Sequence, residues 1–183
     1  MTPRDELCFL IGPTASGKTA LSLEVAERAG AEILSMDSML VYRGMDIGTA
    51  KPGPTERARV PHHLLDLVDP SETFTVQDWL AAANRALADI ASRNTRALIC
   101  GGTALYLKTL LHGMFEGPSV DQELRADLER RFEAEGPERL HADLASIDPR
   151  AAAKIHAHDR KRVIRALEVF HQTGRPISAW QTE

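Results

Sequence analysis

The stretch Gly12-Pro13-Thr14-Ala15-Ser16-Gly17-Lys18-Thr19 matches the pattern G-x-x-x-x-G-K-[ST] at every fixed position. It directly follows the apolar run at residues 7–11 and precedes a helical pattern that continues to Ala29. Glycine lets the backbone turn so that successive N–H groups point at phosphate oxygens, and the start of a helix favours an anion. We therefore predict a phosphate-binding loop (P-loop) at these eight residues, in which Lys18 contacts the terminal phosphates and the Thr19 hydroxyl contacts Mg²⁺.

Short apolar runs alternate with helical patterns over the first two-thirds of the chain. The runs of strand length are residues 7–11, 31–35, 64–68 and 96–100. Helical patterns follow Gly17, Thr75 and Thr103, and the second begins at a capping box formed by Thr75 and Asp78. Strands that alternate with helices are typical of βα units on a parallel sheet. We predict an α/β fold, with a P-loop NTPase-like parallel sheet flanked by helices and a small helical insertion subdomain.

The pattern changes after Gly117-Pro118, where helical periodicity continues without a further strong strand signal. Residues 121–135 carry six acids against three arginines, whereas residues 150–165 carry six Lys and Arg against one acid, Asp159. By itself such a basic run is most often a solvated helix face. We predict a P-loop catalytic core at residues 1–115 and a helical subdomain at residues 116–183, which ends with the start of a return to the core.

The composition is typical of a folded globular protein. The 183 residues are 43% hydrophobic and 26% charged, which excludes a disordered or fibrous chain. The apolar run at residues 7–11 is far shorter than the roughly 20 residues of a membrane span, so we predict a protein without a membrane partner. We also predict that it is cytoplasmic and a monomer. The net charge of −4 argues against a nucleic-acid partner, because phosphate contacts dominate that affinity. Because the charge is unevenly distributed along the chain, a nucleic-acid partner is still considered.

Two further sites of chemistry are expected beside the P-loop. The run at 31–35 leads to Asp37, and the run at 96–100 leads to Gly101-Gly102-Thr103. The carboxyl ends of parallel strands line the ligand crevice, so we expect Asp37 to lie near the P-loop. Asp37 can hold Mg²⁺ through water, act as a base toward an acceptor, or serve as a turn or cap acid. The Thr103 hydroxyl can cap the following helix or contact an anion.

Together these residues resemble the tRNA dimethylallyltransferases, also called tRNA isopentenyltransferases. The matching segments follow the order of the family over essentially the whole chain: GPTASGKT (12–19), DSMLVYRGMDIGTAKP (37–52), PHHLLD (61–66), GGTALYLKTLL (101–111) and RALEVFHQTG (165–174). Many members carry Gln where this chain has Leu40, and the change removes an expected polar contact to the acceptor. Members usually continue well past residue 183, so we expect a fragment or an unusually short member.

The resemblance implies transfer of a dimethylallyl group from its diphosphate to the exocyclic N6 amine of the adenosine 3′ to the anticodon in tRNA. It implies that the P-loop holds the prenyl diphosphate rather than ATP, that Lys18 stabilises the leaving diphosphate, and that Mg²⁺ binds at Thr19. It assigns Asp37 as the general base and places Thr103 near the diphosphate and the acceptor amine. The positions that it assigns to tRNA contact are Asp37, Ser38, Met39, Leu40, Thr103, Arg125, Asp159, Arg160, Lys161, Arg162 and Val163.

Two other functions share the P-loop. A small-molecule or nucleotide kinase would bind ATP at the same loop and transfer its terminal phosphate. A nucleotide-dependent switch would use Asp37 as a metal ligand and Thr103 as a helix cap, without catalysis. The products formed from ATP and from dimethylallyl diphosphate distinguish the three.

Overall fold

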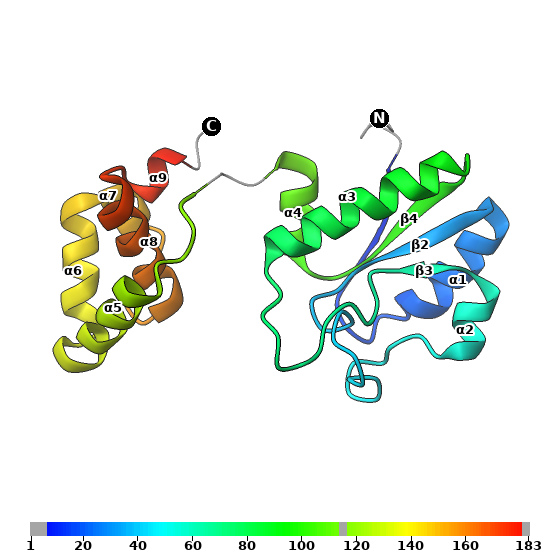
Figure 1. The fold of residues 1–183 in the computed structure, drawn as a ribbon, viewed down its shortest axis with the longest axis horizontal. Coiled ribbons are helices and arrows are strands. Elements are labelled where there is room, and N and C mark those ends of the chain that lie inside the picture. The colour runs from blue at the N-terminus through cyan, green and yellow to red at the C-terminus, as the bar shows by residue number, and fades with distance from the viewer. Residues whose placement is uncertain (1–6, 114–116, 181–183) are drawn as a thin grey trace. The chain divides into compact units, whose positions relative to one another are not determined.

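The computed structural model describes residues 7–113 and 117–180, which belong to two compact units. Unit 1 spans Met1–Met114 and unit 2 spans Phe115–Glu183 (Figure 1). Unit 1 combines strands and helices, whereas residues 117–180 of unit 2 contain helices and no strand. Each unit has its own hydrophobic core.

Unit 1 is built on a four-stranded sheet in the order β1-β4-β2-β3, in which every pair of strands is parallel. The strands are β1 (Cys8–Ile11), β2 (Ala31–Met36), β3 (His62–His63) and β4 (Arg96–Gly101). All six residues of β2 are buried, as its place between β4 and β3 requires, whereas both ends of the edge strand β1 are exposed. The predicted α/β class with a parallel sheet is confirmed.

Helices cover both faces of this sheet (Figure 1). They are α1 (Lys18–Ala29), α2 (Pro54–Arg59), α3 (Val76–Ser92) and α4 (Ala104–His112). Successive side chains of a strand point to opposite faces. Accordingly, Ile33 packs with Leu23 of α1, while Leu34 packs with Trp79 of α3.

Local signals place the ends of these helices correctly. Helix α1 begins directly after Gly17 and ends at Gly30, whose φ of 59° is easily reached without a side chain. At the start of α3, the Asp78 N–H donates to Thr75 Oγ1 at 3.2 Å, and the Thr75 N–H donates to Asp78 Oδ2 at 2.8 Å. The predicted capping box is therefore confirmed.

The prediction of a strand at residues 64–68 is wrong. The third strand is the two-residue β3, and Leu64 and Asp66 have φ angles of 64° and 54°, which break an extended conformation. Val68 makes only an isolated parallel bridge with Tyr42. Leu64 is 6% exposed and belongs to the core, so its apolar character reflects burial in a turn rather than a strand.

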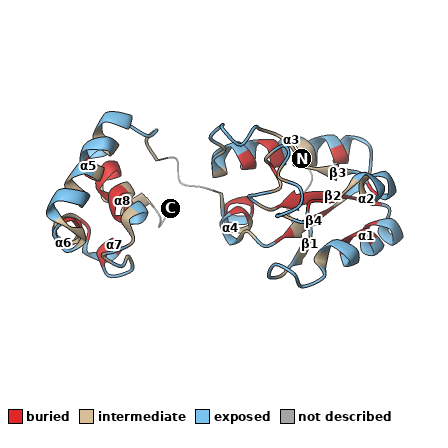
Figure 2. Ribbon diagram, turned by 90° about the horizontal axis from the view of Figure 1, so that it is seen from below, coloured by how far each residue is buried: buried red, intermediate tan, exposed pale blue. Residues whose placement is uncertain are grey.

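Unit 2 is an assembly of helices around one apolar cluster. They are α5 (Gln122–Glu135), α6 (Pro137–Ile147), α7 (Pro149–Ala152), α8 (Arg160–Thr173) and α9 (Ile177–Trp180). Leu128, Leu144 and Leu167 belong to this cluster, and Figure 2 shows buried residues between the helices and exposed residues on their outer faces. Helix α8 begins after its N-cap Asp159, whose Oδ1 accepts from the Arg162 N–H at 3.2 Å. None of the helices within residues 7–113 and 117–180 is long and apolar enough to cross a membrane.

Candidate active site

The P-loop adopts the strained turn that its sequence predicts. Gly17 and Ala15 have φ angles of 81° and 64°, and α1 starts at the next residue, Lys18. Lys18 Nζ donates to the carbonyl of Pro13 at 2.5 Å, which places the ammonium over the loop. Among the described residues, no group accepts a hydrogen bond from the N–H of Ala15 or Gly17. These N–H groups and the ammonium are suited to phosphate oxygens.

Asp37 and Thr103 meet at the carboxyl end of the sheet. Asp37 Oδ1 accepts from the Met39 N–H at 2.8 Å, which fixes the orientation of the carboxylate. The next residue, Ser38, donates its N–H to Thr103 Oγ1 at 3.2 Å. Thr103 occupies the N-cap position of α4, but its hydroxyl makes no capping bond to that helix. Its side chain joins the end of β4 to the segment after β2.

Two glycines allow this close approach. A Cβ on Gly101 would lie 2.1 Å from the carbonyl oxygen of Met36, at the end of β2. A Cβ on Gly102 would lie 2.9 Å from the carbonyl oxygen of Gly12, at the start of the P-loop. Both separations are shorter than real Cβ contacts, so only glycine brings the P-loop and the ends of β2 and β4 together here.

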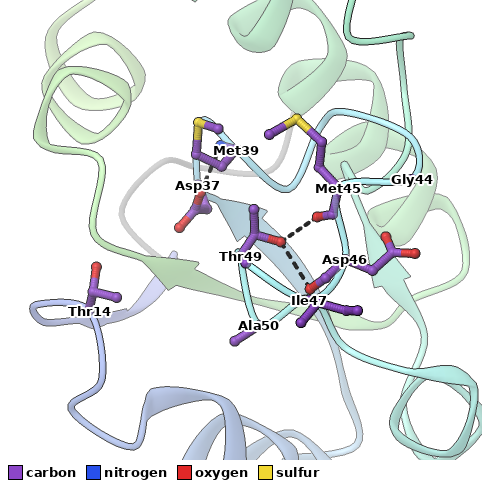
Figure 3. Close-up of a pocket in the computed structure, with 10 residues that line it drawn as sticks. Thr14, Asp37, Met39, Gly44, Met45, Asp46, Ile47, Thr49 and Ala50 are labelled. Atoms are coloured by element: carbon purple, nitrogen blue, oxygen red, sulfur yellow. Dashed lines mark hydrogen bonds between the residues drawn. The ribbon is translucent and has the colours of Figure 1, made fainter.

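A pocket of about 590 Å³ opens at this junction (Figure 3). Its lining consists of Thr14, Asp37, Met39, Gly44, Met45, Asp46, Ile47, Gly48, Thr49 and Ala50. Thr14 comes from the P-loop and Asp37 follows β2, so the pocket joins the two predicted centres of chemistry. Figure 3 shows the side chains of Met39 and Met45 on one side of the pocket and Thr14 across from them. Flexible, polarizable methionines suit an apolar group or an aromatic base, and the two acids suit an amine.

The loop at residues 44–50 supplies most of the lining, and these residues are not among the site residues predicted from the sequence. The segment 37–52 has turn residues and no periodicity, which usually describes an ordinary surface loop. Two features of the sequence could have indicated that this segment belongs to the site. It contains Gly44 and Gly48, and it directly follows the end of a predicted strand. The predicted contact residue Leu40 is not part of the pocket lining in the described chain; its carbonyl accepts from the Asp66 N–H at 3.1 Å.

In unit 2, the arginines predicted to contact tRNA form ion pairs with acidic side chains of the same unit. Arg125 Nη2 lies 2.7 Å from Glu168 Oε2, and Glu168 is fully buried. Arg160 Nη2 lies 2.6 Å from Glu129 Oε2 and also contacts Glu133. These acids offset much of the positive charge that the sequence alone suggests for the start of α8.

The other predicted positions of this segment differ in accessibility. Arg162 pairs with Asp159 at 3.2 Å but keeps 72% of its side chain exposed. Lys161 is exposed and, among the described residues, has neither an ion pair nor a side-chain hydrogen bond. Val163 is completely buried in the core of unit 2, so its side chain serves packing. Of the cations at the predicted tRNA-contact positions, Lys161 and Arg162 are therefore the ones exposed to a polyanion.

The residues present fit a magnesium ion that is bound mainly by a substrate. Within residues 7–113 and 117–180, no three His, Cys, Asp or Glu side chains gather into a metal-binding group. Mg²⁺ generally keeps several waters and takes one or two protein ligands plus substrate phosphates, so it needs no such cage. The exposed Thr19, at the first turn of α1, and Asp37 offer that small set of oxygen donors.

Comparison with protein families gives two matches. A family model described as IPP transferase matches residues 40–183, and one described as isopentenyl transferase matches residues 5–67. The chain is 54% identical over 178 residues to the tRNA dimethylallyltransferase of Geobacter metallireducens, covering 97% of the chain and 58% of that protein. It is 54% identical over 169 residues to the enzyme of that name from Methylococcus capsulatus, covering 92% and 54%. The chain thus spans little more than half the length of these relatives.

Solved structures show the same fold. The full-length tRNA isopentenylpyrophosphate transferase from Bacillus halodurans aligns with a TM-score of 0.61 at 44% identity, covering 94% of the chain and 57% of that structure. A eukaryotic dimethylallyltransferase acting on tRNA aligns with a TM-score of 0.80 at 30% identity, covering 97% and 44%. These likenesses confirm the predicted P-loop NTPase-like arrangement.

Proposed function

Because the chain belongs to the IPP transferase family, we propose that it transfers a dimethylallyl group from dimethylallyl diphosphate to the N6 amine of the adenosine 3′ to the anticodon in tRNA. The observation that best supports the proposal is that Thr14 of the P-loop and Asp37 line the same pocket. Such a pocket suits a diphosphate at one side and an acceptor amine at the other. Since the substrate is tRNA, we place the enzyme in the cytoplasm, and we propose that it acts as a monomer.

The P-loop holds the leaving group in this proposal. As the allylic C–O bond breaks, negative charge grows on the diphosphate, and the N–H groups of residues 12–19 and the Lys18 ammonium stabilise that charge. Thr19 would hold Mg²⁺. The bound ion would supply further positive charge to the diphosphate. No ATP is consumed.

Asp37 accepts the proton in this proposal. Its Oδ1 is occupied by the Met39 N–H, and among the described residues Oδ2 has no hydrogen-bond donor. The N6 amine forms a C–N bond with the allylic carbon and gives its proton to Asp37, a role typically worth 10²–10⁴-fold in rate. Thr103 is held beside this position by its bond to Ser38 and contacts the acceptor amine or the diphosphate.

The acceptor must leave its stack to reach such a pocket. An exocyclic amine within a folded anticodon loop is poorly accessible, so the enzyme extrudes the base. We propose that Lys161 and Arg162 contact the phosphate backbone of the anticodon stem, since they are the accessible cations at the start of α8. Arg125, Asp159 and Arg160 position this surface through their ion pairs and capping bonds.

A product analysis tests the proposal. The chain is incubated with tRNA and Mg²⁺ in the presence of dimethylallyl diphosphate or of ATP, and the digested RNA is examined by mass spectrometry. We expect prenylated adenosine with dimethylallyl diphosphate and no loss of ATP. Phosphorylated products with ATP, together with no prenylated adenosine, would establish the kinase instead.

A further inference from the structure

The loop at residues 44–50 has no helix or strand to hold it over the pocket. It contains two left-handed residues, Gly44 (φ 70°) and Ala50 (φ 50°). Thr49 gives it local support, because its hydroxyl donates to the carbonyl of Met45 at 2.5 Å. Local bonds of this kind fix the shape of the turn but not its place relative to Asp37. The attachment to the rest of unit 1 must come from other residues.

Lys51 makes that attachment. Its side chain is 1% exposed, and Nζ reaches three oxygens: the Tyr42 carbonyl at 2.5 Å, Asp66 Oδ1 at 2.7 Å and Asp46 Oδ1 at 3.0 Å. An ammonium has three donors, so this set uses all of them. Tyr42 precedes the pocket loop, Asp46 lies within it, and Asp66 belongs to the segment after β3.

The surroundings of Lys51 keep it charged. Burial alone would lower the pKa of this ammonium, but hydrogen bonds and opposite charges from Asp66 and Asp46 raise it above its usual value. Asp66 also pairs with Arg57, whose Nη1 lies 2.8 Å from Asp66 Oδ2. Arg57 Nε in turn donates to the carbonyl of Pro52 at 2.8 Å. Two cations and two acids therefore form a balanced network behind the loop.

Asp46 connects this network to the pocket. Its carboxylate contacts Lys51, yet 61% of its side chain is exposed and the residue lines the pocket with Asp37. We propose that Lys51 is a positioning residue: by holding Asp46 and the ends of the loop, it sets where the acceptor adenosine stands relative to Asp37. This inference rests on the proposed prenyl transfer and assigns the loop a role in orienting the acceptor.

The variant Lys51→Met tests this role, because it keeps an unbranched side chain of similar length and removes its three donors. We expect kcat for transfer to an anticodon stem–loop RNA to fall by about 10²-fold, the typical effect of misplacing a reacting group by about 1 Å. The affinity for dimethylallyl diphosphate is expected to stay unchanged, since the P-loop is not part of the network. Lys108→Met, at an exposed residue of α4, is the matched control and should keep the wild-type kcat.

Hydrogen exchange provides a reading that does not depend on catalysis. In Lys51→Met we expect faster exchange of the amides at residues 44–50 and unchanged exchange in β4. If Lys51→Met fails to fold, Asp46→Leu carries the test, because it cuts the loop from Lys51 at a largely exposed side chain. Asp46→Asn keeps an oxygen that can accept from Lys51 and should retain the slow exchange at residues 44–50 that Asp46→Leu loses.

The outcomes separate the two proposals. Wild-type kcat in both Lys51→Met and Asp46→Leu, or unchanged exchange at residues 44–50, would overturn the role of Lys51. An equal loss of diphosphate affinity and of kcat would also overturn it, because it would show general damage to the site. If the wild-type chain forms no prenylated adenosine, the proposed function fails, and the exchange measurement alone decides whether Lys51 holds the loop.

Discussion

At the scale of single residues, the tasks that we propose for Asp37 and for the P-loop are separable. One oxygen of Asp37 is fixed by the Met39 N–H, and the P-loop N–H groups lie on a different segment. We expect Asp37→Asn to lower kcat for prenyl transfer by about 10²–10⁴-fold, because the base is lost while the shape is kept. Calorimetry should show retained binding of dimethylallyl diphosphate. Loss of both prenyl transfer and diphosphate binding would instead indicate that Asp37 acts mainly as a metal ligand.

Lys18 is expected to show the opposite behaviour. Its ammonium lies over the P-loop, where it can meet the terminal phosphate of the substrate. Lys18→Met should weaken the binding of dimethylallyl diphosphate, measured by calorimetry, because a charge-assisted hydrogen bond is removed. Binding of the stem–loop RNA should be unaffected, and this is the internal control. Unchanged diphosphate affinity would contradict the assignment of this loop.

A buried acid on the opposite end of β2 gives a pH-dependent prediction. Burial by itself would raise the pKa of Glu32, but Arg93 at 2.8 Å and His63 at 2.6 Å outweigh it and hold the pKa below its ordinary value of 4.5. The ionised carboxylate therefore stabilises the fold above about pH 4.5, and this contribution is lost as the pH falls through the lowered value.

Glu32→Gln should thus lower the free energy of unfolding at pH 7 by about 1.5–3 kcal/mol, the usual contribution of a hydrogen bond to a charged group. The difference from the wild type should shrink when urea unfolding is repeated well below pH 4.5. Glu24→Gln is the control, since Glu24 makes only an exposed pair with Arg28 and should change little. A difference that is independent of pH would contradict the charge-based explanation.

The sequence could predict that Asp37 and Thr103 lie at the same edge of the sheet, because the carboxyl ends of parallel strands converge there. It could not predict Lys51. A lysine in a turn-rich loop is ordinarily solvated, and its burial depends on Asp66, a residue in another segment of the chain. Asp46 was not predicted because the pocket that it lines with Thr14 and Asp37 arises from tertiary structure.

At the scale of elements, the junction of β2 and β4 depends on Gly101. An added methyl group would lie 2.1 Å from the Met36 carbonyl, and a backbone atom cannot move aside as a flexible side chain can. We expect Gly101→Ala to destabilise unit 1 by at least about 1–3 kcal/mol, as overpacking does, and to separate Thr103 from Ser38. Urea unfolding measures the loss of stability.

The matched control is Gly48→Ala, because a Cβ there meets nothing within 4 Å and φ is outside the left-handed region. Its stability should equal that of the wild type. Equal stability of Gly101→Ala and Gly48→Ala would contradict the close approach of the two strand ends.

Element boundaries were predictable where their signals are local. The caps of α1, α3 and α8 involve residues within a few positions of each other, so glycine, threonine and aspartate identify them directly. The prediction of a strand at residues 64–68 was wrong because an apolar run indicates that residues are buried but does not determine their backbone conformation. Leu64 is buried at a positive φ, which only the surrounding structure imposes.

At the scale of the whole molecule, the two units have separate cores. The apolar clusters of unit 1 draw on residues of that unit, and the cluster containing Leu144 draws only on unit 2. Leu144 is completely buried, so Leu144→Ala should destabilise unit 2 by about 2–5 kcal/mol and leave the stability of unit 1 unchanged.

The two tryptophans of the chain can report the units separately. Trp79 lies in the core of unit 1 and Trp180 packs against the core of unit 2. With Trp79→Phe as background, the fluorescence transition of Trp180 should move to lower urea in Leu144→Ala. With Trp180→Phe as background, the transition of Trp79 should stay in place. A common shift of both transitions would show that the units unfold as one.

We propose that one pocket brings a prenyl diphosphate and the amine of a tRNA adenosine together, and a matched pair of RNAs tests this proposal. Two anticodon stem–loops differ only in carrying adenosine or guanosine at the position 3′ to the anticodon. Each is incubated with the chain, Mg²⁺ and dimethylallyl diphosphate, and the prenylated nucleoside is located by mass spectrometry. We predict prenylation of the adenosine RNA at that position only and no product from the guanosine RNA. Equal prenylation of both RNAs, or a product formed only when ATP is supplied, would show that the pocket does not perform this transfer.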